Sequence, residues 1–224
     1  MGYKTELHCH SKEFSWCASH AAQDIVAQYR SCGYTTIVLT NHLSPSYFDI
    51  YKGLSWEQLI RKHFAAVETM RECAGDSMNV IAGTEIRFRE NGNDYLVFGM
   101  DEEAFLAVPD ALEMSISEFY GEAASKGALV IQAHPFRPGM TVIDYKDVDG
   151  VEVYNGSHTN PLYNKQALSL AENCTDKVLI RTSGSDHHHA SQMPSGGIIT
   201  DQPITCTAEL LRNLRCGDYT LICD

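Results

Sequence analysis

The sequence predicts an α/β protein whose strands form a closed or partly closed barrel. Short apolar runs alternate with longer amphipathic runs along the 224 residues, and this alternation is typical of parallel strand–helix units. The pattern predicts about seven strands and about five helices. It contains no linker rich in Pro, Gly or Ser, no repeat and no low-complexity tract. We therefore expect a single domain over residues 1–224.

The predicted strands are short runs rich in β-branched and other apolar residues, bounded by polar or turn-forming ones. The run Thr35-Thr36-Ile37-Val38-Leu39-Thr40 shows this composition most clearly. In chain order, we expect strands at residues 3–9, 35–40, 79–85, 94–98, 127–133, 150–154 and 177–183.

The predicted helices are longer segments in which apolar residues recur at helical spacing. In the first of them, Ile25, Val26 and Tyr29 share one face, and Cys32-Gly33 ends the segment. In chain order, we expect helices at residues 20–32, 56–74, 115–126, 162–172 and 207–214.

Composition excludes several classes of protein. No apolar run approaches the ~18 residues of a membrane span, and the first residues lack the basic-then-apolar order of a signal peptide. We therefore expect a cytoplasmic protein with no membrane partner. The net charge of −12 makes a long nucleic-acid footprint unfavourable, because such a footprint needs Lys and Arg to replace phosphate counterions.

The eight cysteines form no C-x-x-C pair, so neither a zinc knuckle nor a thioredoxin-like motif is indicated. Without export, most of them are expected to be free thiols that serve as small buried apolar groups. Cys9 stands between two candidate ligands, and in a strand its side chain is expected to point away from them.

Residue types that bind metal ions follow the predicted strands. They are His8 and His10, then Asn41 and His42, then Glu85 and His134, and finally Asp186 and His188. The carboxyl ends of strands in a parallel barrel share one face, where such folds carry their active sites. We therefore expect these side chains to converge, although they are far apart in the sequence.

The chemistry of these residues suits a metal centre. His8 and His10 alternate along an extended strand, so both imidazoles face the same side and can chelate one borderline cation. Glu85 offers two oxygens, the usual bridge between cations about 3.5–4 Å apart. Asp186 can give an oxygen to one ion while His188 reaches a neighbouring one. Each signal is weak alone, and their joint occurrence at strand ends indicates a shared site.

Five motifs carry the candidate ligands. They are Glu6-Leu7-His8-Cys9-His10-Ser11, Thr40-Asn41-His42, Gly83-Thr84-Glu85, Ala133-His134-Pro135 and Gly184-Ser185-Asp186-His187-His188. In order and approximate spacing, this series resembles the PHP (polymerase and histidinol phosphatase) superfamily. The resemblance implies a distorted (β/α)7 barrel, a centre of two or three divalent ions (Zn, Mn or Fe), and hydrolysis of a phosphoester.

The resemblance also implies three ligand sets. They are His8, His10, Glu85 and Asp186 for the first ion, Glu85, His134 and Asp94 for the second, and His42 and His188 with one loop residue for the third. Asp94 stands where relatives often have a further histidine. The loop residue is open between Glu13, the first candidate, and His20. The chain departs from the family pattern at Glu6 and Asn41, where relatives often have aspartates, and the amide of Asn41 is expected to alter metal affinity or ligand basicity.

The expected chemistry is attack on phosphorus by hydroxide, because binding to a divalent cation lowers the pKa of water toward ~7. His188 or His42, where not engaged by metal, would protonate the leaving oxygen. Arg137, three residues after His134, is expected to bind a phosphate oxygen with its forked donors, and Arg87 is a second candidate. The expected substrate is a small phosphate monoester or a nucleotide.

Three alternatives stay open. An amidohydrolase-type metal hydrolase also uses an H-x-H motif in a barrel, but it commonly needs a metal-bridging lysine, and Lys62, Lys126 and Lys146 do not follow obvious strand ends. A silent metal-binding or regulatory module would keep the ligands without turnover. A nuclease or proofreading domain is disfavoured by the short chain and its negative charge.

Overall fold

A computed structural model describes residues 2–175 and 177–224 of the chain. The strands are β1 (Tyr3–Cys9), β2 (Tyr34–Leu39), β3 (His42–Leu43), β4 (Asn79–Arg87), β5 (Asp94–Phe98), β6 (Leu129–Gln132), β7 (Gly150–Asn155), β8 (Ile180–Gly184), β9 (Gly196–Thr200) and β10 (Thr220–Cys223). The helices are α1 (Ala22–Ser31), α2 (Pro45–Ile50), α3 (Trp56–Ala74), α4 (Glu102–Leu106), α5 (Ile116–Ser125), α6 (Leu162–Asn173) and α7 (Thr207–Cys216).

The strands form one mixed sheet in the order β10-β9-β1-β2-β4-β5-β6-β7-β8, with β3 paired to β4. Neighbours run parallel from β1 to β4 and from β6 to β8, whereas β5 runs antiparallel to both β4 and β6. The predicted α/β barrel is confirmed. The expectation of purely parallel units is wrong at β5, because a short connection turns the chain straight back from β4 instead of crossing over through a helix.

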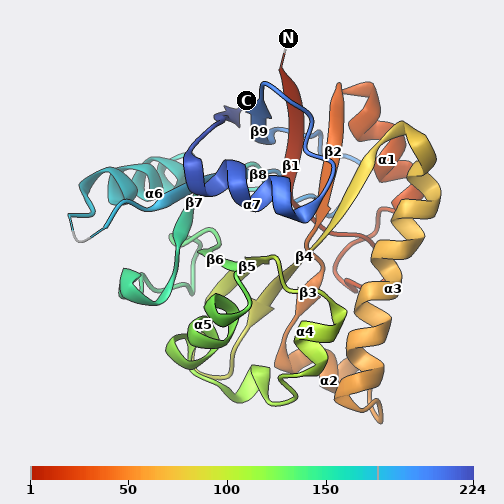
Figure 1. Ribbon diagram of the computed structural model, residues 1–224, viewed down its shortest axis with the longest axis vertical. Helices are drawn as coiled ribbons and strands as arrows, with labels where there is room; N and C mark the ends of the chain where they lie inside the picture. Colours follow the sequence, from red (N-terminus) through yellow and green to blue (C-terminus); the bar gives the residue numbers. More distant parts are fainter. Residues whose placement is uncertain (1, 176) are drawn as a thin grey trace.

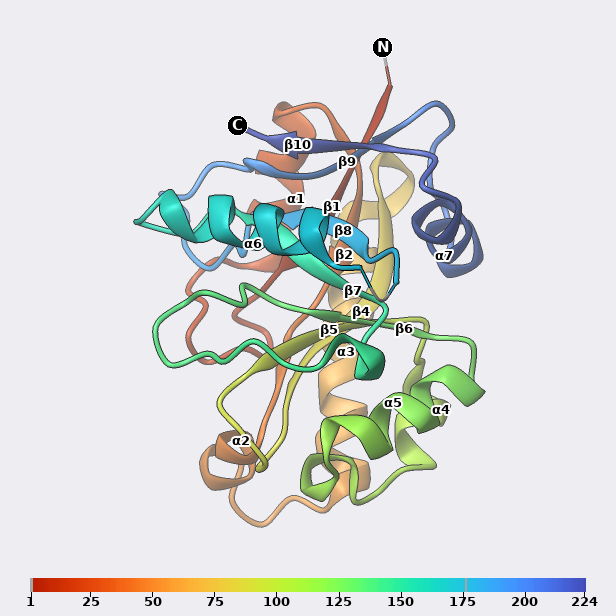
Figure 2. The ribbon, with the colours of Figure 1, turned by 90° about the vertical axis from the view of Figure 1, so that its left-hand side faces the viewer.

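The barrel is nearly closed where β8 returns to β1. The backbone N–H of His10 donates to the carbonyl of His187 at 3.0 Å, and His187 N–H donates to the carbonyl of His8 at 3.4 Å. The first half of β1 is instead paired antiparallel with β9, which β10 extends (Figure 2). On this side, β1 therefore pairs with β9 along its first half and with the segment after β8 along its second half. This change of partner distorts the barrel.

Side chains that alternate along the strands divide the apolar core into two layers. Ile37 and Leu39 belong to the cluster beneath α1 and α3, whereas Val38 between them belongs to a second cluster that also contains Leu210 and Leu214 of α7. Helices α1 and α3 lie side by side over β2 and β4, and α5 lies beside β6 (Figure 1). The interior is thus filled with apolar side chains near one end of the strands, and polar groups are left for the other end.

Local signals explain the helix boundaries. Ser55 and Gln58 form a reciprocal capping box at the start of α3, and Ser115 and Glu118 do the same for α5. These two helices begin within one residue of their predicted starts. The first helix begins at Ala22, two residues later than predicted, where its backbone N–H donates to the Glu13 carboxylate at 3.1 Å.

Some elements were not predicted. Strand β9 begins with two glycines, an unusual start for a strand, but Gly197 has φ 122° and a Cβ there would lie 2.3 Å from the carbonyl oxygen of Thr5. β3, β10, α2 and α4 are short, so they give little periodicity. All eight cysteines are free, as expected, but the expectation that most are buried is wrong, because only Cys9 is buried. Within the described ranges, no helix combines the length and the apolar character needed to cross a membrane.

Candidate metal centre

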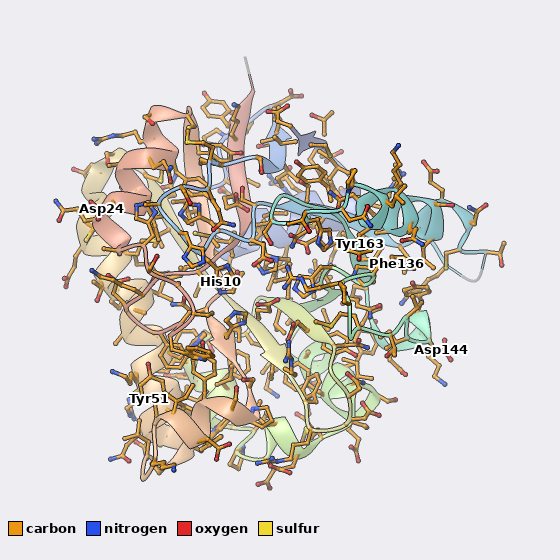
Figure 3. All side chains as sticks on the ribbon, turned by 180° about the vertical axis from the view of Figure 1, so that it is seen from behind. His10, Asp24, Tyr51, Phe136, Asp144 and Tyr163 are labelled. Carbon is orange, nitrogen blue, oxygen red and sulfur yellow. The ribbon has the colours of Figure 1, made fainter. Side chains whose placement is uncertain are left out.

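The predicted ligands converge where the strands of the barrel end. Seen from behind, His10 lies near the middle of the molecule, whereas Asp24 and Asp144 lie at its periphery (Figure 3). Asp94 joins the same edge although it begins its strand, because β5 runs antiparallel to β4. Reversal of one strand therefore brings the start of β5 beside the end of β4, and a residue from each can share a site.

The first ligand set surrounds one point between β1, β4 and the end of β8. His8 Nε2 lies 3.3 Å from Glu85 Oε1 and 3.4 Å from Asp186 Oδ1. His10 Nε2 lies 3.3 Å from Glu85 Oε2 and 3.4 Å from the same Asp186 oxygen. All four side chains are buried. Two imidazole nitrogens and two carboxylates thus face a common centre, as the sequence predicted.

The second ligand set shares Glu85. His134 Nε2 lies 2.9 Å from Glu85 Oε1 and 3.8 Å from Asp94 Oδ2, so these three residues can surround one cation. Asp94 also accepts two hydrogen bonds from the Arg87 guanidinium, at 2.7 and 2.6 Å. The register of β4 and β5 places Arg87 directly opposite Asp94. Arg87 is therefore tied to a candidate ligand at the edge of the site.

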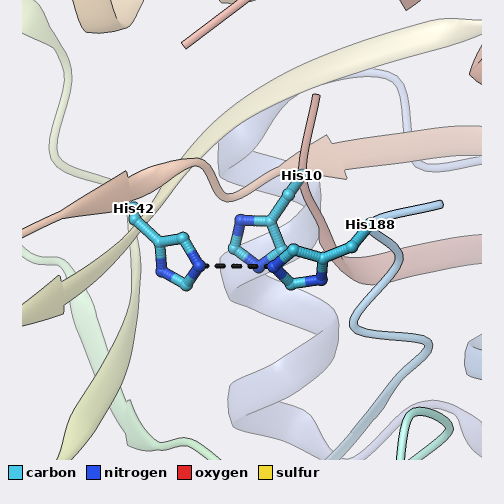
Figure 4. A group of neighbouring side chains, drawn as sticks. All are labelled: His10, His42 and His188. Carbon is cyan, nitrogen blue, oxygen red and sulfur yellow. Dashed lines mark hydrogen bonds between the residues drawn. The ribbon is translucent and has the colours of Figure 1, made fainter. Parts of the chain in front are cut away.

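Of the predicted third set, His42 and His188 lie together, and the residue that completes the group is His10 rather than a loop residue (Figure 4). The Nε2 atoms of His42 and His188 are 3.3 Å apart, and the His10 ring lies 4.2 Å from the His42 ring and 4.3 Å from the His188 ring, between centroids. Pairing of β3 with β4 sets His42 opposite Glu85, and His42 Nδ1 lies 2.6 Å from Glu85 Oε2. Glu85 therefore contacts histidines of all three sets.

Unsatisfied polar atoms at the centre fit bound cations. His8 Nε2, both ring nitrogens of His10 and Asp186 Oδ1 are buried without a well-formed hydrogen bond. A buried polar atom without a partner is costly, so native proteins rarely leave several in one place. Lone pairs of imidazole and carboxylate that converge in this way suit Zn, Mn or Fe ions.

The backbone is strained at two ligands. Asp186 has φ 50° and His134 has φ 27°, the only non-glycine positive values among the described residues. Residues other than glycine rarely adopt a positive φ, and backbone strain of this kind is found most often at functional sites. At both positions the chain has just left a strand, and the left-handed turn directs the side chain into the centre.

The ionisation states of the ligands also suit metal binding. Burial would raise the pKa of Glu85, but His42 and His8 hold it well below its usual range. Burial would likewise raise the pKa of Asp186, but the neighbouring His8 and His10 keep it well below its usual range. Burial and the neighbouring His42 and His188 hold the pKa of His10 well below its usual value, so this imidazole is neutral and one of its ring nitrogens has a lone pair for a cation.

Glu152 supports the ligands from behind. Its Oε1 lies 2.8 Å from His8 Nδ1, and its Oε2 accepts from the His134 backbone N–H at 2.9 Å and from Asn155 Nδ2 at 3.0 Å. A carboxylate on the far nitrogen of a ligating histidine fixes the tautomer that leaves the other nitrogen free for metal. Glu152 therefore orients His8 toward the centre.

The Glu152→Gln variant is expected to bind metal about 10–100-fold more weakly. Both Glu152 oxygens accept hydrogen bonds. In the Glu152→Gln variant the amide NH₂ would replace one of them, so it would point either at the His8 ring or at the N–H donors of His134 and Asn155. Competition with a chromophoric chelator measures the change, and Glu172→Gln on the exposed face of α6 is the matched control. Equal metal affinities for the two variants would contradict this role.

Glu6 ties β1 to the turn that carries Asp186. Its carboxylate accepts from the backbone N–H groups of Leu7, His8 and Ser185 at 2.8–2.9 Å and from the Tyr29 hydroxyl at 2.9 Å. Burial raises the pKa of Glu6 to about 7, although these hydrogen bonds lower it. The Glu6-Leu7-His8 motif thus joins the strands on either side of the barrel closure.

The two candidates for the loop ligand have other partners in this structure. Glu13 accepts a hydrogen bond from Ala22 at the start of α1, and His20 Nδ1 lies 2.8 Å from His187 Nε2, so neither reaches His42 or His188. Both stand in a loop whose course the sequence pattern does not define. The amide of Asn41 likewise contacts no ligand histidine.

Arg137 lies inside the centre. It makes an ion pair with Asp186 and donates to the Ser157 hydroxyl at 3.3 Å. Asp186 Oδ2 also accepts from Asn155 Nδ2 at 3.2 Å and from Ser157 Oγ at 3.0 Å. The second oxygen of Asp186 is thus fully engaged, which leaves Oδ1 free to face the histidines.

Cys17 and Glu152 are the site residues that sequence reasoning missed. Glu152 lies inside a predicted strand, and only its position two residues before the strand end could have indicated an inward carboxylate. Burial would raise the pKa of the Cys17 thiol, but hydrogen bonds with His188 and His42 lower it to about 6. Cys17 stands in the loop expected to supply a ligand, and it was passed over for Glu13.

Comparison with solved structures supports the fold. A two-domain protein from Bacteroides vulgatus, containing a predicted PHP-like metal-dependent phosphoesterase, matches with a TM-score of 0.68 at 18% identity, over 100% of this chain and 65% of that one. A lesion-specific endonuclease from Pyrococcus furiosus matches with a TM-score of 0.66 at 13% identity, over 99% and 58%. This chain therefore spans less than two thirds of either protein.

An amidohydrolase from Chromobacterium violaceum matches with a TM-score of 0.57 at 16% identity, over 98% of both chains. At these identities the likeness concerns the fold alone. No curated protein matches the sequence significantly.

The family model decides the relationship. The model of the PHP domain matches residues 6–193, a stretch that contains all of the converging ligands and both strained turns. The chain belongs to the PHP domain family.

Proposed function

We propose that this chain hydrolyses a phosphoester of a small molecule or nucleotide, with two or three divalent cations held at the candidate metal centre. The observation that carries the proposal is the position of Glu85. One of its oxygens faces His8 and His134, and the other faces His10 and His42. A carboxylate shared in this way suits a cluster of adjacent cations, the arrangement used for in-line displacement at phosphorus.

Cations bound there would supply a water of lowered pKa and positive charge for the phosphoryl oxygens. The protein's own groups supply the rest. Arg137, partly buried beside Asp186, presents the remaining donors of its guanidinium to a phosphoryl oxygen. His188 and His42 are partly exposed, so whichever is not a ligand can donate a proton to the leaving oxygen.

The space beside the centre suits a phosphoryl group. A cavity of about 120 Å³ is lined by Cys17, His42, Tyr47, Glu85, Arg87 and Asp94. It is too small for a whole nucleotide, so the rest of the substrate would lie at the surface, beside Trp16. A larger hollow beside α6 is lined by Phe136 and Leu162 and holds no candidate ligand.

Two other functions were considered. The endonuclease from Pyrococcus furiosus favours a nucleic-acid substrate, but the net charge of −12 opposes a long footprint. The amidohydrolase from Chromobacterium violaceum favours a different bond, but among the described residues no lysine contacts the ligands of the centre. A small phosphorylated substrate agrees best with both observations.

Metal-depleted protein, reconstituted separately with Zn, Mn and Fe, tests the proposal. We expect phosphate release from an aryl phosphate monoester or a nucleotide by the metal-loaded protein, and its loss on chelation. An aryl phosphodiester and a short oligonucleotide, assayed in parallel, would identify a nuclease. Metal-loaded protein that hydrolyses none of these would overturn the proposal and favour a silent metal-binding module.

A further inference from the structure

The third ligand set lies against a loop that carries a thiol. Residues 10–21 connect β1 to α1, and Cys17 in this loop lines the same small cavity as His42 and Glu85. Side-chain hydrogen bonds join Cys17 to both His42 and His188. Cys17 therefore lies beside the two histidines whose Nε2 atoms are 3.3 Å apart.

The loop is fixed to both histidines through its backbone and hydroxyl groups. Ser15 Oγ accepts from the His42 backbone N–H at 3.1 Å, and Ser19 N–H donates to the carbonyl of His188 at 2.9 Å. Asn41 Oδ1 accepts from the Ser15 hydroxyl at 2.9 Å. Cys17 lies midway between these attachments. Its position relative to His42 and His188 is thus determined on either side.

A buried group without a partner points to a cation here. His10 is completely buried: its Nε2 faces Glu85 and Asp186 of the first set, its Nδ1 has no partner, and it forms one candidate ligand group with His42 and His188, whose rings lie against its own. The other candidate donors of the loop are engaged elsewhere, Glu13 at the start of α1 and His20 with His187. Cys17 is the donor that remains.

We propose that the Cys17 thiolate is a ligand of a cation held by His42 and His188, so that the two ends of the centre prefer different metals. The inference rests on the metal centre of the proposed function. Nitrogen and sulfur at this end select zinc-class ions, whereas Glu85, Asp94 and His134 at the other end give a carboxylate-rich site that suits Mn or Fe. When the sulfur–metal bond forms, the thiol proton leaves to solvent.

Cobalt absorption tests the sulfur ligand directly. When Co²⁺ is titrated into the metal-depleted full chain, we expect a near-ultraviolet sulfur-to-cobalt charge-transfer band. The Cys17→Ser variant should lack this band and still bind Mn²⁺ with wild-type affinity at the carboxylate end. Cys73→Ser, which removes an exposed thiol of α3, is the matched control and should keep the band. A wild-type protein without the band, or a Cys17→Ser variant that keeps it, would overturn the proposal.

Alkylation of the wild-type protein gives an independent readout, which also serves if Cys17→Ser does not fold. Iodoacetamide labelling followed by peptide mass spectrometry should show Zn²⁺ slowing modification of Cys17 by at least about tenfold, with no change at Cys73. If Zn²⁺ slows the modification of Cys17 and Cys73 equally, or slows neither reaction, the assignment is contradicted. Phosphate release from Mn-loaded protein is scored separately. A charge-transfer band without turnover would refute the proposed function alone, and turnover without the band would refute the thiolate ligand alone.

Discussion

The Glu85→Gln variant is expected to lose phosphoesterase activity by at least ~10³-fold in kcat. Oε1 of Glu85 lies near His134 and His8, and Oε2 lies near His10 and His42. Gln has nearly the same shape but only one acceptor oxygen and no charge. Its amide nitrogen has no lone pair for a cation, so at least one of the adjacent ion positions loses a ligand, and with it the shared bridge.

Metal content and activity measured on the same sample distinguish this outcome from simple misfolding. Glu85→Gln should bind fewer divalent ions per chain than wild type, with an unchanged far-ultraviolet circular dichroism spectrum. Glu72→Gln, an exposed site on α3, should keep both metal and activity. A Glu85→Gln protein with full metal content and wild-type kcat would show that the carboxylate does not bridge cations, and the mechanism proposed above would then be wrong.

The order of strands and helices could be predicted because most elements are long enough to show their period. The 56–74 helix appears with the predicted bounds, and each of the seven predicted strands is present. The direction of β5 could not be predicted, because periodicity carries no information on strand orientation. β9 was missed because its glycines are required by close approach to other strands, Gly197 to Thr5 and Gly196 to Gly184, rather than by any local preference.

Ligands could be predicted where a strand end determines the position of the side chain. His8, His10, Glu85 and His134 all leave strands at the same edge, so a parallel register was enough to bring them together. The loop ligand could not be placed in this way. Whether Glu13 or Cys17 faces His42 depends on how Asn41 and Ser15 fold the loop, and no period in the sequence encodes those hydrogen bonds.

Asp94 lies beside Glu85 and His134, but for a reason that the sequence argument did not contain. The sequence argument placed it by likeness to a histidine of the family, at what a parallel barrel would make the wrong end of a strand. The antiparallel run of β5 corrects the geometry and also sets Arg87 beside Asp94. The antiparallel direction of β5 thus brings the candidate ligand Asp94 and the side chain of Arg87 to the same edge, where Arg87 partly neutralises the Asp94 carboxylate. A parallel β5 would not place these two residues together.

The Gly184→Ala variant is expected to lower the free energy of unfolding by at least about 3 kcal/mol, at the upper end of overpacking costs. A Cβ at Gly184 would lie 2.3 Å from the Cβ of His8, 2.8 Å from Glu152 Oε1 and 3.2 Å from the backbone nitrogen of His8. These neighbours belong to β1 and β7, which flank β8, and neither can retreat without opening the barrel closure. Relief of the clash would also turn His8 away from Glu152, so weaker metal binding should accompany the loss of stability.

Urea unfolding of the metal-free protein measures this change without the contribution of bound ions. Gly121→Ala is the matched control: the residue is exposed within α5 and a Cβ there meets nothing within 4 Å. Since Ala forms helix better than Gly, this variant should be stabilised by about 0.5–1 kcal/mol. If Gly184→Ala lowers the free energy of unfolding and Gly121→Ala raises it, the close contact between β8 and β1, rather than the loss of a glycine as such, causes the destabilisation. If Gly184→Ala instead unfolds at the wild-type urea concentration, β8 and β1 do not pack at the distance that brings Asp186 to His8, and the geometry of the centre would have to be revised.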